Sequence, residues 1–123
     1  MRKNTSRTTK RAARTASRAA PPSVGYETWL IAQLQDPAEA AAYLEAVIDE
    51  GDQAALMLSL RQVAQAQGGI AKIARKAKLT REATYKMLSA SGNPELRSLT
   101  AILAATGLRI GVRPIASGAR TTK

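Results

Sequence analysis

The chain has 123 residues, with 19 Lys and Arg against nine Asp and Glu, and it contains neither Cys nor His. This length predicts one domain with tails, and the composition excludes disulfides, thiolate nucleophiles, Cys- or His-ligated zinc and a histidine general base. The acids are scattered and no apolar run approaches about 18–20 residues, so we expect no enzyme, no metal or other cofactor, no small-molecule substrate and no membrane span. A chain without Cys fits a reducing cytoplasm.

Charge is segregated along the chain. Residues 1–25 carry seven basic groups and no acid, residues 26–60 carry seven acids and no Lys or Arg, and residues 61–123 carry twelve basic groups and two acids. The basic blocks favour a nucleic-acid partner, and the acidic block favours a basic protein partner.

The first 25 residues predict a disordered basic tail, because they hold almost no large apolar side chain. Pro21-Pro22 and Gly25 separate this tail from the body. An alternative is a helix that forms against phosphates, since Arg7, Arg11, Arg14 and Arg18 share one helical face. The Arg/Ser/Thr-rich composition also resembles an organelle transit peptide. We expect one domain over residues 26–115 and a second disordered tail over 116–123.

The first predicted helices of the body lie in the acidic block. Residues 26–35 form either one short helix or an irregular docking segment. Asp36 is a favourable N-cap and Pro37 suits the first helical position, so a helix should run to about residue 50. Gly51 ends it, and Asp52 caps a helix over about 53–67. The apolar faces of these two helices predict buried positions at Ala40, Tyr43, Leu44, Val47, Ile48, Leu56, Leu60, Val63 and Ala64.

Two short helices and a longer one follow in the second basic block. We expect helices over 70–77 and 81–89, with Thr80 capping the second, and a helix over 95–106 that ends at Gly107. The last helix should bury Leu96, Leu99, Ile102 and Leu103. Residues 108–113 alternate with period two, which predicts a short strand that pairs within the chain or with a second copy. The predicted fold is all-α: a five-helix domain with a C-terminal strand and a disordered basic N-terminal tail.

The two short helices predict a helix-turn-helix. Ala74 is small enough for two helices to cross closely, and Thr80 opens the second helix, whose first residues would enter the major groove. The expected base contacts are Thr80, Arg81, Glu82, Ala83, Tyr85 and Lys86. The expected phosphate contacts are Lys72, Arg75, Lys76 and Lys78. Lys78 is the unfavourable residue, because the turn often requires a positive φ, which glycine adopts most easily.

The stretches AAYLEAVIDEGDQAALMLSL, GGIAKIARKAKLTREATYKMLS and GNPELRSLTAILAATGLRIGV resemble the addiction-module antidote proteins, which are HigA-like antitoxins with an Xre/Cro-type helix-turn-helix. The resemblance covers residues 26–112. It implies that Arg81, Glu82, Tyr85 and Lys86 lie on the recognition helix. It also implies a RelE-like ribonuclease toxin as partner and repression of the shared operon. The chain departs from the family pattern at Lys78, where Gly is usual, and at Ala83-Thr84, which are smaller than the usual pair.

Such toxins bind RNA and are therefore basic, so the acidic block is a candidate toxin-binding surface. The residues proposed for it are Tyr26, Trp29, Glu45, Asp49 and Glu50. The alternative is that Asp36, Glu39 and Asp52 are only helix caps and that Glu45, Asp49 and Glu50 only face solvent. We expect a bacterial cytoplasmic, nucleoid-associated homodimer that binds a palindromic double-stranded DNA operator and a RelE/HigB-like toxin. The competing readings are a stand-alone prophage regulator without a toxin and a basic RNA-binding protein.

Overall fold

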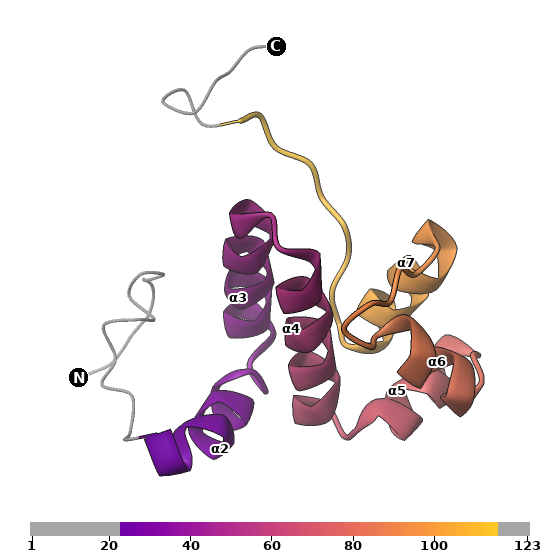
Figure 1. The fold of residues 1–123 in the computed structure, drawn as a ribbon, viewed down its shortest axis with the longest axis horizontal. Coiled ribbons are helices and arrows are strands. Elements are labelled where there is room, and N and C mark those ends of the chain that lie inside the picture. The colour runs from indigo at the N-terminus through magenta and orange to yellow at the C-terminus, as the bar shows by residue number, and fades with distance from the viewer. Residues whose placement is uncertain (1–22, 116–123) are drawn as a thin grey trace.

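A computed structural model describes residues 23–115, which form six helices and contain no strand (Figure 1). The all-α class is confirmed. The helices are α2 (Ser23–Gln33), α3 (Pro37–Glu50), α4 (Gln53–Ala66), α5 (Ile70–Ala77), α6 (Arg81–Met87) and α7 (Leu96–Ala105). Residues 1–22 of the predicted tail 1–25, with its arginine face, and the whole predicted tail 116–123 lie outside the described residues.

The helix ends follow from their capping residues, as predicted. The Asp36 carboxylate accepts a hydrogen bond from the Ala38 N–H at 2.9 Å, and Asp52 accepts one from the Ala55 N–H at 3.2 Å. Between these helices Gly51 adopts φ 77°, a left-handed conformation that ends α3 without a Cβ penalty. The caps fix the turn that folds α4 back along α3.

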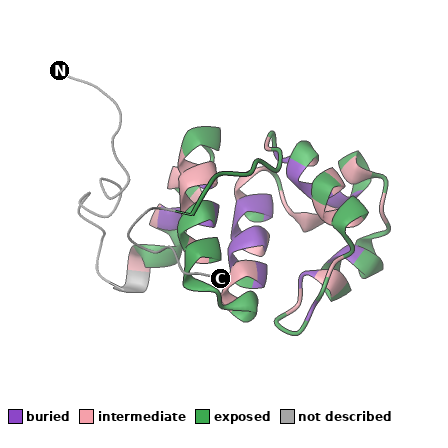
Figure 2. Ribbon diagram, turned by 90° about the horizontal axis from the view of Figure 1, so that it is seen from above, coloured by how far each residue is buried: buried purple, intermediate pink, exposed green. Residues whose placement is uncertain are grey.

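Helix α4 lies at the centre of the fold. It packs against α3, α2 and α5, and α5 in turn packs against α6 and, most extensively, against α7. Figure 2 shows that the helices present buried residues on their facing sides and exposed residues on the other side. The apolar core draws on every helix except the short α6, and is made of Leu30, Leu34, Ala40, Leu44, Met57, Leu60, Val63, Ala64, Ile73, Leu88, Ile102 and Leu103.

Several details differ from the sequence expectations. Helix α2 is regular and begins at Ser23, within the range 1–25 that was predicted as a tail, and residues 23–115 form six helices rather than the predicted five. Leu96, expected to be buried, is 70% exposed at the first position of α7, whose buried residues are Ile102 and Leu103 near the other end. Ile48 is 56% exposed at the end of α3. Residues 108–115 contain no strand in this single chain.

The core also buries polar side chains that the hydrophobic pattern did not indicate. Ser59 and Thr106 are buried because each hydroxyl donates to a backbone carbonyl three residues earlier in its own helix. Gln62 is buried between α3 and α2, where the Tyr43 hydroxyl donates to its Oε1 at 2.5 Å and its Nε2 donates to Glu27 at 3.4 Å. Burial, followed by the negative charges of ionised Tyr26, Glu27 and Glu50, raises the pKa of Tyr43.

Candidate nucleic-acid interface

Helices α5 and α6 are joined by a three-residue turn, residues 78–80. Lys78 adopts φ 63° and ψ 40°, and it is the one non-glycine residue with positive φ among those described. The Leu79 N–H donates to the Ala74 carbonyl at 2.9 Å and the Lys78 N–H donates to the Arg75 carbonyl at 3.1 Å, so two bonds hold the end of α5 in this shape. Lys78 therefore adopts the positive φ that such a turn often requires, although it is not a glycine.

The start of α6 is fixed by Thr80, as predicted. Its Oγ1 accepts a hydrogen bond from the Ala83 N–H at 3.0 Å, and its carbonyl accepts from the Thr84 hydroxyl at 2.8 Å. Thr84 is fully buried and Ala74 is 1% exposed, so a small side chain on each helix lies in the interior beside the turn. The two helices therefore pack closely, and the opposite side of α6 faces solvent.

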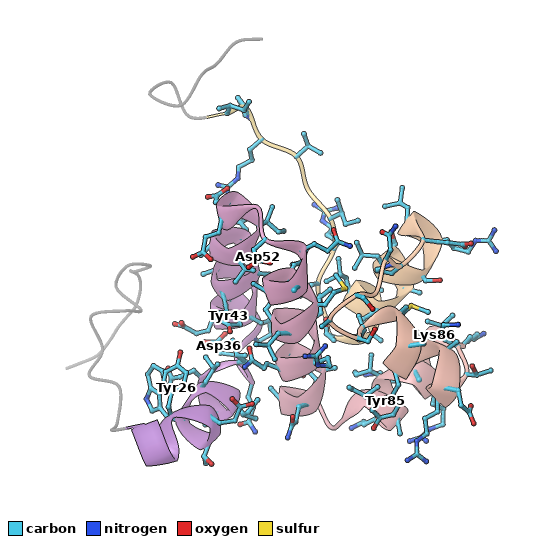
Figure 3. The ribbon with its side chains drawn as sticks, viewed as in Figure 1. Tyr26, Asp36, Tyr43, Asp52, Tyr85 and Lys86 are labelled. Atoms are coloured by element: carbon cyan, nitrogen blue, oxygen red, sulfur yellow. The ribbon has the colours of Figure 1, made fainter. Side chains whose placement is uncertain are left out.

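All six residues predicted to contact bases are exposed on α6 or its cap. Tyr85 is 46% exposed, and the Arg81 guanidinium carbon lies 5.8 Å from the centroid of its ring, within the range of a cation–π contact. Figure 3 shows Tyr85 and Lys86 at the opposite end of the fold from Tyr26 on α2. The structure therefore gathers this predicted set on one solvent-facing surface.

The four residues predicted to contact phosphates lie beside that surface. Lys72, Arg75 and Lys76 are exposed on α5, and Lys78 is exposed in the turn. Together with Arg81 and Lys86 they make six basic side chains, which we call the basic face. Within residues 23–115 the ion pair found is between Arg113 and Glu45, and Glu82 on α6 is a carboxylate on the same surface as the basic face.

The end of α6 and the loop after it are also fixed by residues of α4 that the sequence did not indicate. The Arg61 guanidinium of α4 donates a hydrogen bond to the Leu88 carbonyl at the end of α6. The Gln53 side chain donates to the Gly92 carbonyl at 3.0 Å. A Cβ on Gly92 would lie 2.0 Å from the Met87 carbonyl oxygen, so the loop after α6 passes too close for any other residue. Spacing along the chain gives no signal for these contacts, which join distant segments.

The residues predicted to bind a toxin are not gathered on one face. Tyr26 and Trp29 lie together on α2, with ring centroids 5.8 Å apart, and Trp29 packs partly into the core. Glu45 and Asp49 are one helical turn apart on α3, whereas Glu50 is rotated by about 140° from Glu45 and lies near Tyr43. The structure thus divides the set into two surfaces, one on each side of α3.

Residues 27–114 match the family model described as "Probable addiction module antidote protein". This chain belongs to that family. Membership supports an antitoxin role and a toxin partner, and proteins of this family are generally not enzymes. Comparisons with curated proteins and with solved structures gave no match. No helix within residues 23–115 is both long and apolar enough to cross a bilayer, and no cluster of potential metal ligands occurs in that range.

Proposed function

We propose that this antidote-family protein represses its own operon by sequence-specific DNA binding and neutralises a RelE/HigB-like ribonuclease toxin by direct binding. The observation that carries the DNA proposal is the basic face around α6, an exposed helix end with six cationic side chains and one carboxylate, Glu82, beside them. Both activities consist of binding and need no catalytic group.

The basic face supports two kinds of DNA contact. Side chains on the first turns of α6 enter the major groove, where Arg81 donates two hydrogen bonds to guanine and Glu82 accepts from cytosine. Lys72, Arg75 and Lys76 contact phosphates, which position the helix and give affinity but carry no sequence information. The turn at Lys78 adds a further cation beside the helix end. The operator would be palindromic and bound by two copies, with half-sites about one helical turn apart.

Binding to the duplex that precedes the gene tests this proposal. Fluorescence anisotropy should show tighter binding to that duplex than to a scrambled duplex or to single-stranded RNA. Arg81→Ala should weaken operator binding by about 1–3 kcal/mol and reduce the discrimination between duplexes. Arg97→Ala is the matched control, because Arg97 is an exposed arginine on α7, outside the basic face. Equal affinity for RNA and for all duplexes would refute sequence-specific repression.

Lys76→Ala separates phosphate contacts from base contacts. This variant should weaken binding to operator and scrambled duplexes by the same factor, and it should reduce the slope of log K against log salt by about 1. A change in sequence preference would instead place Lys76 against a base edge.

We propose that the toxin binds an acidic surface of this protein, because a ribonuclease that binds RNA is basic. Charge across such an interface raises the association rate and orients the partners. Glu45→Lys, Asp49→Lys and Glu50→Lys should each slow association with the co-encoded toxin, measured by biolayer interferometry at low salt. Glu95→Lys, an exposed acid before α7, is the control. Unchanged association in all three variants would exclude electrostatic docking at α3.

A further inference from the structure

Tyr85 is a large aromatic residue that α6 leaves at the surface (Figure 3). The residue before it, Thr84, is fully buried, whereas the Tyr85 side chain is 46% exposed and does not belong to the apolar core or to the side chains packed against it. Within residues 23–115 its hydroxyl forms no hydrogen bond. The ring therefore contributes little to the core, and it can be replaced without disturbing the fold.

The Tyr85 ring contacts Arg81, the first residue of α6. The guanidinium carbon lies 5.8 Å from the ring centroid, within the range of about 6 Å for a cation–π contact. Residues four positions apart share one face of a helix, and a long helical side chain points back toward the N-terminus, so the ring extends over the turn that carries Arg81. Glu82 directly follows Arg81 and does not share that face, and the two form no ion pair within residues 23–115.

The backbone beneath this contact is fixed at both ends of α6. Thr80 accepts a hydrogen bond from the Ala83 N–H at 3.0 Å, and the Arg61 guanidinium donates to the Leu88 carbonyl. The helical turn between Arg81 and Tyr85 is therefore held in place. A tyrosine side chain has fewer rotatable bonds than an arginine side chain, so the ring is the stiffer partner and restricts where the guanidinium lies.

The contact leaves the hydrogen-bond donors of Arg81 available. The guanidinium forms no hydrogen bond with another residue within residues 23–115. A cation–π contact acts between the positive charge and the face of the ring, so it needs no acceptor atom. A carboxylate would instead accept from the same N–H groups that donate to guanine O6 and N7. An aromatic ring at position 85 is thus compatible with base recognition by Arg81 in a way that an acid is not.

We propose that Tyr85 is a positioning residue for DNA recognition, whose ring holds the Arg81 guanidinium ready to bind guanine. The inference rests on the proposed function, because it assigns Tyr85 a role within the same DNA site. A free arginine loses side-chain conformational entropy when it donates two parallel hydrogen bonds to one base. The ring imposes part of this restriction before DNA binds, and such preorganisation raises the affinity for the correct base.

Base preference in ring variants of the full-length protein tests the proposal. A substitution scan of the duplex that precedes the gene first locates the base pair at which the wild type and Arg81→Ala differ most. Tyr85→Leu should reduce the preference at that base pair by about two- to fivefold, as expected for loss of an exposed cation–π contact. It should leave the salt dependence unchanged, because Tyr85 carries no charge. Tyr85→Phe keeps the ring and should keep the preference. Tyr26→Leu, at an exposed tyrosine at the opposite end of the fold, is the matched control.

Two comparisons show whether Tyr85 acts through Arg81. In the Arg81→Ala background, Tyr85→Leu should cause no further loss of preference at that base pair, because the partner of the ring is already absent. An additive loss would show that Tyr85 contacts the base itself and would overturn the positioning role. Equal losses in Tyr85→Phe and Tyr85→Leu would assign the effect to the hydroxyl and would also overturn it. So would a Tyr85→Leu variant with the wild-type preference, or a scan in which no base pair distinguishes Arg81→Ala from the wild type.

Nuclear magnetic resonance of the protein without DNA separates this inference from the proposed function. The ring current of Tyr85 should move the side-chain protons of Arg81 upfield relative to their position in Tyr85→Leu, and Tyr85→Phe should retain the shift. A wild-type spectrum without this shift would overturn the inference whatever the protein binds. A shift in a protein that does not discriminate between duplexes would instead refute sequence-specific repression, and with it the recognition role of the contact.

Discussion

The turn at Lys78 makes a quantitative prediction about stability. A left-handed conformation costs a residue with a Cβ about 1–2 kcal/mol, and glycine avoids this cost. Glycine also has more conformational freedom in the unfolded chain, and this lowers the stability of the glycine variant by about 0.4–1 kcal/mol. The φ of 63° at Lys78 is held by two backbone hydrogen bonds, so it cannot relax to a helical value without losing them. Lys78→Gly should therefore stabilise the fold by about 0.5–1 kcal/mol, the difference between these two effects.

A matched control removes the same charge nearby. Lys76 is exposed within α5, where glycine is unfavourable, so Lys76→Gly should destabilise the fold by about 0.5–1 kcal/mol. Urea unfolding followed by far-UV circular dichroism measures both variants, at one protein concentration because the stability of the proposed dimer would depend on concentration. The melting temperature should rise by about 2–8 °C for Lys78→Gly and fall by a similar amount for Lys76→Gly.

Opposite signs for the same Lys-to-Gly change are the expected result, since loss of charge alone acts in the same direction at both positions. If Lys78→Gly destabilises the protein as much as Lys76→Gly does, Lys78 is not left-handed. DNA affinity provides an independent readout, because Lys78→Gly removes a cation from the basic face. It should weaken binding even though the fold is more stable.

Three further substitutions test other contacts. Gly92→Ala should destabilise the fold by about 2–4 kcal/mol, as a buried hydrogen bond and close packing are lost, because the new Cβ would lie 2.0 Å from the Met87 carbonyl oxygen. Thr80→Ala should cost about 1 kcal/mol by removing the N-cap of α6. Tyr43→Phe should cost about 1–3 kcal/mol, because it leaves the buried Gln62 oxygen without its donor. The folded-state pKa of Tyr43 is raised, so the protonated phenol favours folding and its contribution is lost as pH rises above about 10. Tyr43→Phe should therefore also flatten the loss of stability in alkaline solution.

Controls for these variants come from the same regions. Ser91→Ala changes an exposed residue beside Gly92 and should shift stability by no more than about 0.5 kcal/mol. A Gly92→Ala variant as stable as Ser91→Ala would contradict the close passage of the loop. For Thr80, the Gly variant should lose less stability than Ala, because glycine is itself an acceptable N-cap residue. An alkaline unfolding profile of Tyr43→Phe that parallels the wild type would show that Tyr43 is not the group responsible.

Local chemistry explains which parts of the fold the sequence predicts well. Asp36, Asp52 and Thr80 cap their helices through contacts within three residues, and Gly51 ends α3 through its own backbone. These contacts depend on neighbours in the chain, so their residue types predict them. The helix bounds and the exposed surface of α6 follow from the same local signals.

Burial that depends on distant segments is predicted less well. Leu96 continues the apolar spacing of α7, yet it is exposed, and the buried residues of this helix are Ile102 and Leu103. Gln62 looks polar and solvent-facing in the sequence, but Tyr43, nineteen residues earlier in the chain, donates a hydrogen bond to its buried oxygen. The contacts of Arg61 and Gln53 with the end of α6 are also long-range. The binding roles of the basic face and of the acids on α3 remain predictions.

The central position of α4 has a consequence for how the molecule opens. Helix α2 meets the body mainly through α4, whereas α4 contacts three helices and is hydrogen-bonded through Arg61 to the end of α6. Thermal fluctuations can therefore release α2 while the remaining helices stay folded, but they cannot expose α4 without near-complete unfolding. Amide hydrogens of α4 should exchange with solvent deuterium at the rate set by global unfolding. Those of α2 should exchange earlier, as a separate cooperative unit.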